Sequence, residues 1–444
     1  MINNSKETAV TLLGTLIWLL AAFFYLYEFF IRATVGTIAQ QLLPDLHLNA
    51  ESFAMMGSAY YLAYAVMQMP VGMITAKVGT KRTLIAAISI CVTSVFLFSH
   101  ATGFTSALLA RLLMGFGSSF AFVCLLVTAT IWFPQKYFSR ISGISQFLGT
   151  MGPLLAAGPM AWLLMQLHGD WRLLMNGVGV VGIILAVGVV LVMREKAQDR
   201  SASVIYLSKP EATTTSVRRL FSNKQAWYIA LYSGVVYCPI TFLGEFWGTS
   251  FLQAQGFSQS MSASIISVSW LGMALAALMF GFTSEAIKRR KPVLIFCAAV
   301  GLVGSVLITY LPTLPFSVYA LLFFCVGVAA AGQSLGFSVI SEHVDAANRP
   351  TALGLNNGMV TVFGISIPPI TGYLINLSAH GHAAHFVVSD FTTSFTVMPL
   401  MYLLALFISL FLVKETYCRP QKDVILLTPA DEPSDFELEP ELNY

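Results

Sequence analysis

The sequence predicts an all-α membrane protein whose helices cross the bilayer twelve times. Of its 444 residues, 57% are hydrophobic and only 10% are charged. The mean hydropathy is +0.75, and a soluble domain of this composition would expose far too much apolar surface to water. Backbone polar groups in hydrocarbon need partners within their own segment, so each apolar run of roughly 20 residues is predicted to be a spanning helix.

The predicted spans follow one another along almost the whole chain, with boundaries good to a few residues. We place them at residues 11–39, 51–76, 83–99, 103–133, 140–165, 171–193, 225–252, 260–284, 292–310, 315–343, 350–376 and 391–413. The first run is about twice as long as the apolar part of a signal peptide and has no small-residue cleavage site, so we expect it to be retained as a helix.

Basic residues set the expected orientation. Of the 24 Lys and Arg residues, only Arg32 and Arg111 lie within predicted spans, and only Arg172 lies in an odd-numbered loop. The positive-inside rule therefore places both termini and the even-numbered loops in the cytoplasm, in agreement with an even number of spans. The basic residues anchor this topology beside lipid headgroups, so the net charge of +3 does not indicate a nucleic-acid partner.

The chain divides into two halves of similar size. We expect an N-terminal six-helix bundle at 1–193, a cytoplasmic linker at 194–224, a C-terminal six-helix bundle at 225–415 and a tail at 416–444. The linker is polar and basic. The tail is rich in carboxylates and has no Lys or Arg after Lys422, so we expect it to be disordered.

Signatures of catalysis and of metal binding are weak. His380, His382 and His385 lie near Asp390 in a predicted outer loop, and we expect this loop to be solvated rather than to hold a metal. The six cysteines have no paired spacing, so we expect free thiols. The charges within the spans are spread over several helices, whereas an enzyme needs a compact polar site. We expect neither an enzyme nor a cofactor or metal.

Two predicted cytoplasmic loops carry similar sequences at matching places in the two halves. The loop between spans 2 and 3 reads GMITAKVGTKR from Gly72 to Arg82, and the loop between spans 8 and 9 reads GFTSEAIKRRK from Gly281 to Lys291. They resemble the Gly-x-x-x-Asp-Arg-x-Gly-Arg-Arg loop that occurs once per half in the major facilitator superfamily. In the superfamily, the acidic residue of this loop pairs with basic residues and helix ends and holds one conformation closed. In the first loop Ala76 occupies this position, so the resemblance implies that the N-terminal half lacks this pairing.

Further motifs extend this resemblance along the membrane region. Span 4 contains Arg111 followed by Gly115 and Gly117, similar to the Arg-x-x-x-Gly-x-Gly motif of the superfamily, and span 5 contains Gly152-Pro153, similar to its Gly-Pro motif. The resemblance implies two six-helix bundles that rock about a central site by alternating access. The alternative for these glycines and prolines is static packing. The residues that we assign to a conformational switch are Gly72, Gly79, Arg82, Gly152, Pro153, Glu285 and Arg289.

Charged residues within the spans are the strongest candidates for a central site. Each costs roughly 2.5 to 3.5 kcal/mol to insert, so a retained charge needs a function or a partner. Glu28 and Arg32 lie four residues apart on one face of span 1, Arg111 lies in span 4, and Glu245 lies in span 7 at a depth similar to that of Glu28. Two alternatives remain: Glu28 and Arg32 neutralise each other, and Arg111 binds backbone carbonyls as a packing residue.

Two buried cations and two buried anions suit a zwitterion or a small carboxylate as substrate. Arginine matches a carboxylate with two parallel hydrogen bonds, and a glutamate holds an ammonium group or carries a proton. Burial favours the neutral carboxyl group whereas a nearby arginine favours the ionised one, so the sequence leaves proton coupling open. Polar and aromatic residues that accompany these charges in the spans are Tyr60, Tyr61, Tyr64, Gln68, Gln146, Tyr237, Trp247, Trp270, Gln333, Asn356 and Asn357. Of these we expect Tyr64, Gln146, Trp247 and Asn356 to line the cavity.

The patterns around the charges suggest a substrate class. Tyr-x-Tyr-Glu-x-x-x-Arg ending at Arg32 and Glu-Phe-Trp-Gly starting at Glu245 resemble the branch of the superfamily that includes lysosomal dipeptide carriers and bacterial organic-anion permeases. This implies a monomeric transporter in the lipid bilayer of a bacterial inner membrane. Its expected substrate is an amino acid, a short peptide or a polycarboxylate, with protons as a possible second partner. The alternatives are an exporter of sugars or drugs by proton antiport and a receptor that transports nothing.

Overall fold

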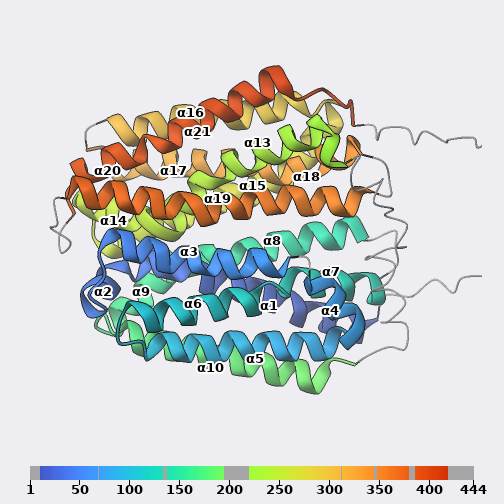
Figure 1. Ribbon diagram of the computed structural model, residues 1–444, viewed down its shortest axis with the longest axis horizontal. Helices are drawn as coiled ribbons and strands as arrows, with labels where there is room; N and C mark the ends of the chain where they lie inside the picture. The colour runs from blue at the N-terminus through green and yellow to red at the C-terminus, as the bar shows by residue number, and fades with distance from the viewer. Residues whose placement is uncertain are drawn as a thin grey trace, which may run out of the picture.

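The computed structural model describes residues 11–418 except Met69, Pro312 and the segments 134–137, 195–219, 345–347 and 380–385. Within these residues all regular structure is helical. The helices run side by side along the long axis of the molecule (Figure 1). The all-helical fold class is therefore confirmed, whereas most of the predicted linker, the three histidines of the outer loop and nearly all of the acidic tail lie outside the described residues.

The helices form an N-terminal and a C-terminal half, which occupy the lower and upper parts of Figure 1. The N-terminal half comprises α1 (Leu12–Thr37), α2 (Ala39–Asp45), α3 (Ala50–Met67), α4 (Pro70–Val78), α5 (Thr80–Ser99), α6 (Phe104–Ser118), α7 (Ala121–Trp132), α8 (Phe138–Ala156), α9 (Gly158–Gln166) and α10 (Trp171–Val192). The C-terminal half comprises α13 (Lys224–Thr241), the π-helix η2 (Phe242–Trp247), α14 (Gly248–Ala254), α15 (Gln259–Ala286), α16 (Lys291–Tyr310), α17 (Phe316–Ala330), α18 (Gly332–Glu342), α19 (Arg349–Ser378), α20 (Val388–Phe395), α21 (Val397–Phe407) and the π-helix η4 (Ile408–Leu412).

The described part of the chain contains 11 helical stretches that are long and apolar enough to cross a membrane. The predicted span at 51–76 is not among them, although it is helical as α3 and α4. Serines, tyrosines and Glu51 lower the hydropathy of α3. A polar helix is tolerated in a membrane protein when its neighbours cover it, and α3 packs between α6 and α19.

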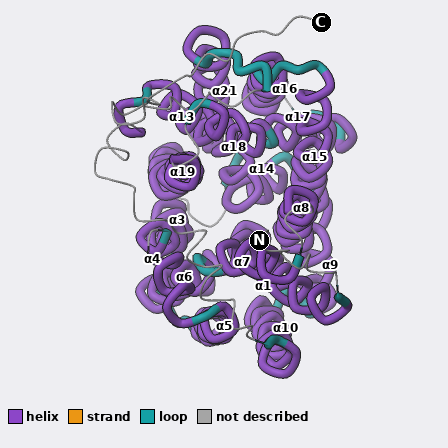
Figure 2. Tube along the Cα trace, turned by 90° about the vertical axis from the view of Figure 1, so that its right-hand side faces the viewer, coloured by secondary structure: helices purple, strands orange, loops and turns teal. Residues whose placement is uncertain are grey.

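The two halves meet along a seam with two sides. On one side α3 lies beside α19, and on the other α8 lies beside α15 (Figure 2). We call the end of the molecule where α1 begins and η4 ends the termini face, and the other end the opposite face. Figure 1 shows the termini face on the right. Helix α1 runs from the termini face to the opposite face, and α3 runs back.

Matching close contacts support the internal pseudo-symmetry. A β-carbon at Gly115 in α6 would collide with the backbone carbonyl of Tyr60 in α3. In the second half, a β-carbon at Gly327 in α17 would collide with the carbonyl of Ser269 in α15. Small residues let helices approach closely in lipid, where apolar attraction between helices is absent. The fourth and second spans of each half are therefore packed in the same way.

Several predicted spans are interrupted, and the break in span 5 has a clear cause. Pro159 at the start of α9 has no N–H to donate to Leu155 in α8, so α8 ends at Ala156 and α9 begins at Gly158, whereas Pro153 lies inside α8. The break leaves the Gly158 N–H without a helical partner, and the only backbone hydrogen bond to the Leu154 carbonyl among the described residues is a long one of 3.4 Å from the Ala157 N–H. Ser267 from the other half donates to that carbonyl at 2.7 Å and accepts from that N–H at 2.8 Å.

Candidate functional site

A buried ion pair joins the two halves in the middle of the molecule. Arg32 Nε of α1 lies 3.2 Å from Glu245 Oε1 of η2, and their side chains are 7% and 1% exposed. Two of the four predicted buried charges therefore meet across the seam. Sequence spacing favours Glu28 as the partner of Arg32, but the partner in the structure is 213 residues away along the chain.

Two tyrosines and a phenylalanine complete the surroundings of this pair. Tyr61 of α3 donates from its hydroxyl to Glu245 Oε2 at 2.5 Å, and Arg32 Nη2 donates to the hydroxyl of Tyr237 at 3.4 Å. The guanidinium carbon of Arg32 lies 3.8 Å from the centre of the Phe29 ring. Both carboxylate oxygens of Glu245 thus have donors from the N-terminal half.

Glu28 is held separately within the N-terminal half. Its side chain is completely buried, and Tyr60 donates to Oε2 at 2.7 Å. Its other oxygen, Oε1, has no hydrogen-bond partner among the described residues. A carboxyl group with one free oxygen in a dry environment is suited to hold a proton.

Arg111 contacts the backbone of α1 rather than a carboxylate. Its Nη1 and Nη2 donate to the carbonyl oxygens of Ile31 and Arg32 at 2.9 and 3.2 Å, and its guanidinium lies 4.9 Å from the centre of the Tyr60 ring. This geometry matches the packing alternative. Arg111 fixes the turn of α1 that carries Arg32.

The other predicted cavity residues are placed less uniformly. Gln146 and Tyr64 are half-buried, where Gln146 accepts a 3.0 Å hydrogen bond from Tyr25 and the Tyr64 ring stacks on Tyr60 with 6.2 Å between centroids. Asn356 is fully buried, and neither of its side-chain polar atoms has a partner among the described residues.

Trp247 does not lie beside the ion pair but in an aromatic cluster nearer the opposite face. Its ring is fully buried and lies 5.2 Å from that of Phe53 in α3, with Phe386 and Phe391 at 6.0 and 6.4 Å. The rings come from both halves. The cluster therefore helps to hold the two halves together near the opposite face.

The local geometry of η2 places Glu245 at the seam. The π-helical turn interrupts the α-helix around Glu245, and such turns are frequent at functional sites. Gly36 of α1 lies against this turn, because a β-carbon there would be only 2.7 Å from the carbonyl carbon and oxygen of Glu245.

Hydrogen bonds across the seam are concentrated toward the opposite face. Besides the Ser267 contacts with α8 and α9, the side chains of Gln41 and Gln259 are 2.9 Å apart, and Gln253 donates to Gln40 at 2.7 Å. Nearest the termini face, Asn357 donates to Gln68 at 3.2 Å. The molecule is thus closed at the opposite face.

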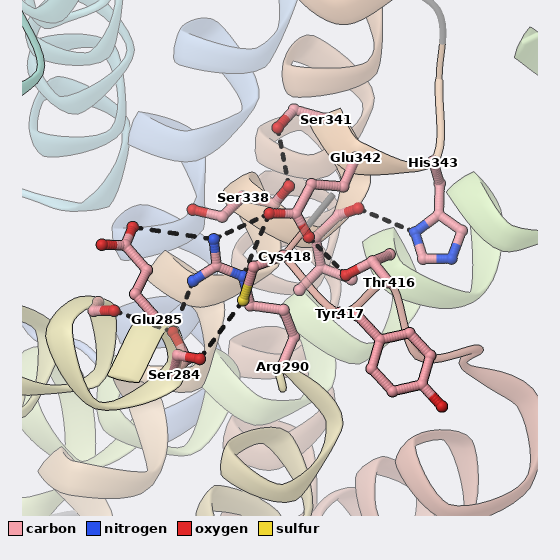
Figure 3. A network of polar contacts seen from close by, with 12 residues as sticks. Ser284, Glu285, Arg290, Ser338, Ser341, Glu342, His343, Thr416, Tyr417 and Cys418 are labelled. Carbon is pink, nitrogen blue, oxygen red and sulfur yellow. Dashed lines mark hydrogen bonds and ion pairs between the residues drawn. The ribbon is translucent and has the colours of Figure 1, made fainter. Parts of the chain in front are cut away.

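The loop after α15 forms a polar network at the termini face (Figure 3). Arg290 donates from Nε and Nη2 to Glu342 Oε1 at 3.2 and 2.8 Å, and from Nη1 to Ser284 Oγ at 2.6 Å. Its Nη2 also lies 3.9 Å from Glu285, which is largely exposed. Arg289, the residue that the loop motif predicts for the switch, is exposed, and its neighbour Arg290 is the arginine that ties this loop to α18.

Glu415 adds the chain segment that follows η4 to this network. Its two oxygens accept from the backbone N–H groups of Arg290 and Lys291 at 2.9 Å each and from those of Thr416 and Tyr417 at 3.0 and 3.1 Å. A carboxylate at this position satisfies the free N–H groups at the start of α16. No motif in the sequence points to this contact of Glu415.

The matching loop of the first half is simpler. Gly79 has a φ of +92° and precedes α5, a backbone conformation that favours glycine. Lys81 donates to the carbonyl of Val190 at 2.9 Å, and Arg82 is exposed. Gly72 and the Gly152-Pro153 pair are buried in α4 and α8.

Comparison with known proteins gives one consistent family. The model of the Major Facilitator Superfamily matches residues 17–270 and 246–425. The chain is 24% identical to the probable L-galactonate transporter of Escherichia coli K12, covering 94% of this chain and 93% of the relative. It is 25% identical to the probable galactarate/D-glucarate transporter GudP of Bacillus subtilis, with 80% and 84% covered. It is 21% identical to the hexuronate transporter of the same species, with 78% and 84% covered.

Solved structures show the same fold. A bacterial homologue of the human lysosomal transporter Spinster, in an inward-facing and unoccupied conformation, superposes with a TM-score of 0.72 at 16% identity, covering 92% of this chain and 97% of that chain. A D-xylose–proton symporter superposes with a TM-score of 0.73 at 14% identity, with 93% and 100% covered.

Proposed function

This chain belongs to the major facilitator superfamily and is a multi-pass membrane transport protein, and from that premise we propose that it carries a small carboxylate-bearing metabolite by alternating access. The observation that carries the proposal is the buried pair of Arg32 and Glu245 at the seam. Arg32 already holds a carboxylate, so a carboxylate of a substrate fits the same donors.

Charge balance connects this exchange to a proton. The site contains two arginines and two glutamates, Glu28 and Glu245, so its fixed charges cancel. A bound monoanion that displaces Glu245 leaves one uncompensated negative charge in a medium where such a charge is costly. A proton on Glu28 or on the released Glu245 restores the balance. We propose that uptake is proton-coupled for this reason.

Sugar acids are the substrates to test first. Three relatives are named as transporters of L-galactonate, of galactarate and D-glucarate, and of hexuronate, all of which combine a carboxylate with several hydroxyl groups. Half-buried polar side chains between the ion pair and the termini face would meet those hydroxyls; they are Tyr64, Gln68, Gln146 and Asn357.

Orientation completes the proposal. The positive-inside rule makes the termini face cytoplasmic. The closure at the opposite face then corresponds to a state that is closed toward the outside. We propose that this state alternates with one opened at the Gln41–Gln259 contact, in a monomer of the bacterial inner membrane.

Uptake into proteoliposomes tests the function. We expect saturable uptake of radiolabelled galactonate or glucarate that shows counterflow and falls when an uncoupler abolishes the proton gradient. Arg32→Ala reduces uptake by at least about a hundredfold because it leaves Glu245 buried and unpaired. Arg172→Ala is the matched control, since Arg172 pairs with Asp45 at 2.8 Å in a partly exposed position away from the seam.

Three results would contradict the proposal. Carboxylate uptake that survives Arg32→Ala would remove the arginine from the site. Transport of neutral sugars or drugs in preference to all acids would favour the exporter. Absence of flux for every solute class would favour a receptor.

A further inference from the structure

Tyr61 does more than line the proposed substrate site, because it also connects the two halves of the protein. It belongs to α3 of the N-terminal half, it is 4% exposed, and its ring lies against α19 of the other half, where a β-carbon at Gly364 would be 2.7 Å from the ring. Its hydroxyl donates to Glu245 Oε2 at 2.5 Å. Tyr61 therefore contacts the C-terminal half through both its ring and its hydroxyl.

The bonds of Glu245 explain the importance of that hydroxyl. Arg32 binds Oε1 and Tyr61 binds Oε2, so the carboxylate of the C-terminal half is held at both oxygens by the N-terminal half. A substrate that replaces Glu245 on Arg32 must also break the bond to Tyr61. Hydrogen bonds to an ionised group in a dry site are among the stronger ones.

From this arrangement we infer that Tyr61 is a positioning residue that keeps Glu245 on Arg32 while the substrate site is empty. The inference rests on the proposed function, because it assigns the substrate carboxylate to Arg32. It adds a specificity rule: a ligand releases Glu245 only if its binding to Arg32 also offsets the loss of the hydrogen bond between Tyr61 and Glu245. The empty transporter then stays closed at the opposite face.

The neighbouring tyrosines have different roles. Tyr60 donates to Glu28 within its own half. Tyr237 lies on α13, continuous with the η2 turn that carries Glu245, and accepts from Arg32. Among the described residues, Tyr61 is the tyrosine whose hydroxyl donates across the seam to a carboxylate.

Tyr61→Phe removes this hydroxyl and keeps the ring. Glu245 competes with the substrate for Arg32 and loses one hydrogen bond in this variant. We therefore expect the KM for the transported acid to fall about tenfold, while kcat changes by less than about threefold. A role in packing alone would lower the amount of folded protein and leave KM unchanged.

A second measurement needs no substrate. Spin labels at Met165 and Met261, two exposed positions near the opposite face in different halves, report the separation of the halves in a background with Cys325→Ser and Cys418→Ser. For the substrate-free Tyr61→Phe variant, we expect a larger population at long distance than for wild type. If wild type transports no carboxylate, the proposed function fails, whereas this distance measurement still decides the role of Tyr61.

Two controls make the test specific. Tyr27→Phe removes another buried hydroxyl, which donates to the Val178 carbonyl at 3.2 Å within the N-terminal half, and should change neither KM nor the label distances. In a Glu245→Gln background, Tyr61→Phe should shift the label distances far less than in wild type. Unchanged KM and distances in Tyr61→Phe, equal changes in Tyr27→Phe, or a full effect without Glu245 would each overturn the inference.

Discussion

The backbone of Gly36 packs directly against the backbone carbonyl of Glu245, so closely that a β-carbon at Gly36 would lie 2.7 Å from its carbon and oxygen. The contact joins the last turn of α1 to the π-helical turn of the opposite half. The neighbouring atoms belong to the backbone of Glu245, so they cannot move aside as a flexible side chain would.

Gly36→Ala therefore separates the halves near the opposite face. We predict that uptake falls at least about tenfold and that spin labels at Met165 and Met261, on either half near the opposite face, show a larger population at long distance than in wild type. Gly354→Ala serves as the control, since a β-carbon there meets no atom within 4 Å. Normal uptake and unchanged label distances in Gly36→Ala would show that this contact is not needed for closure.

Arg111→Gln should act on stability more than on substrate binding. The guanidinium binds two carbonyl oxygens of α1, so its loss removes charged hydrogen bonds worth roughly 1.5 to 3 kcal/mol each. We predict a lower Tm in detergent and, for the protein that remains folded, a smaller loss of substrate affinity than Arg32→Ala causes. A loss of binding without loss of stability would instead place Arg111 on the substrate.

Arg290 and Arg289 provide a matched pair in the loop after α15. Arg290→Lys loses the fork that donates twice to Glu342, and we predict destabilisation of about 2 kcal/mol. Arg289→Lys changes an exposed side chain and should alter stability by less than about 0.5 kcal/mol. Thermal unfolding of both variants checks this, and equal effects would show that the fork contributes nothing specific.

Glu415 makes the stability of the termini face dependent on pH. Burial alone would raise the pKa of Glu415, but four backbone N–H groups donate to the ionised form, so the pKa lies below its usual value of 4.5. A lowered pKa in the folded state means that Glu415 stabilises the protein above pH 4.5 and that this stabilisation disappears as the pH falls through the lowered value.

The measurement compares wild type with Glu415→Gln. At pH 7 we predict that the variant is less stable by about 1 kcal/mol, a modest value because the group is partly exposed. The difference in Tm should shrink as the pH is lowered below 4.5. A difference that is constant with pH would mean that Glu415 acts through packing rather than through charge.

The sequence predicted the helical architecture well because hydropathy and helix length are local properties. It also selected Glu28, Arg32 and Glu245, since a charge in an apolar span is conspicuous. It did not predict the pairing of Arg32, because local spacing points to Glu28 whereas the fold delivers Glu245 from the other half.

The surroundings of Trp247 and Arg289 also differ from those predicted from the sequence. In both cases the direction of the side chain about the helix axis is the cause. Trp247 follows Glu245 by only two residues, but the π-helical turn directs it into the aromatic cluster with Phe53. Arg289 and Arg290 are adjacent, yet α15 ends at Ala286 and Lys288 has a φ of +52°, so only Arg290 turns inward. Such angles depend on tertiary contacts that the amino-acid pattern does not contain.

The hydroxyl of Ser267 completes the interrupted backbone between Leu154 and Gly158 in the other half. When the halves part, the Gly158 N–H loses its partner and the Leu154 carbonyl keeps only the long bond from Ala157, at a depth where an unsatisfied group is expensive. A slightly parted arrangement would bear this penalty before water can enter to relieve it. Separation at this point is consequently an all-or-none event, which disfavours partly open, leaky intermediates.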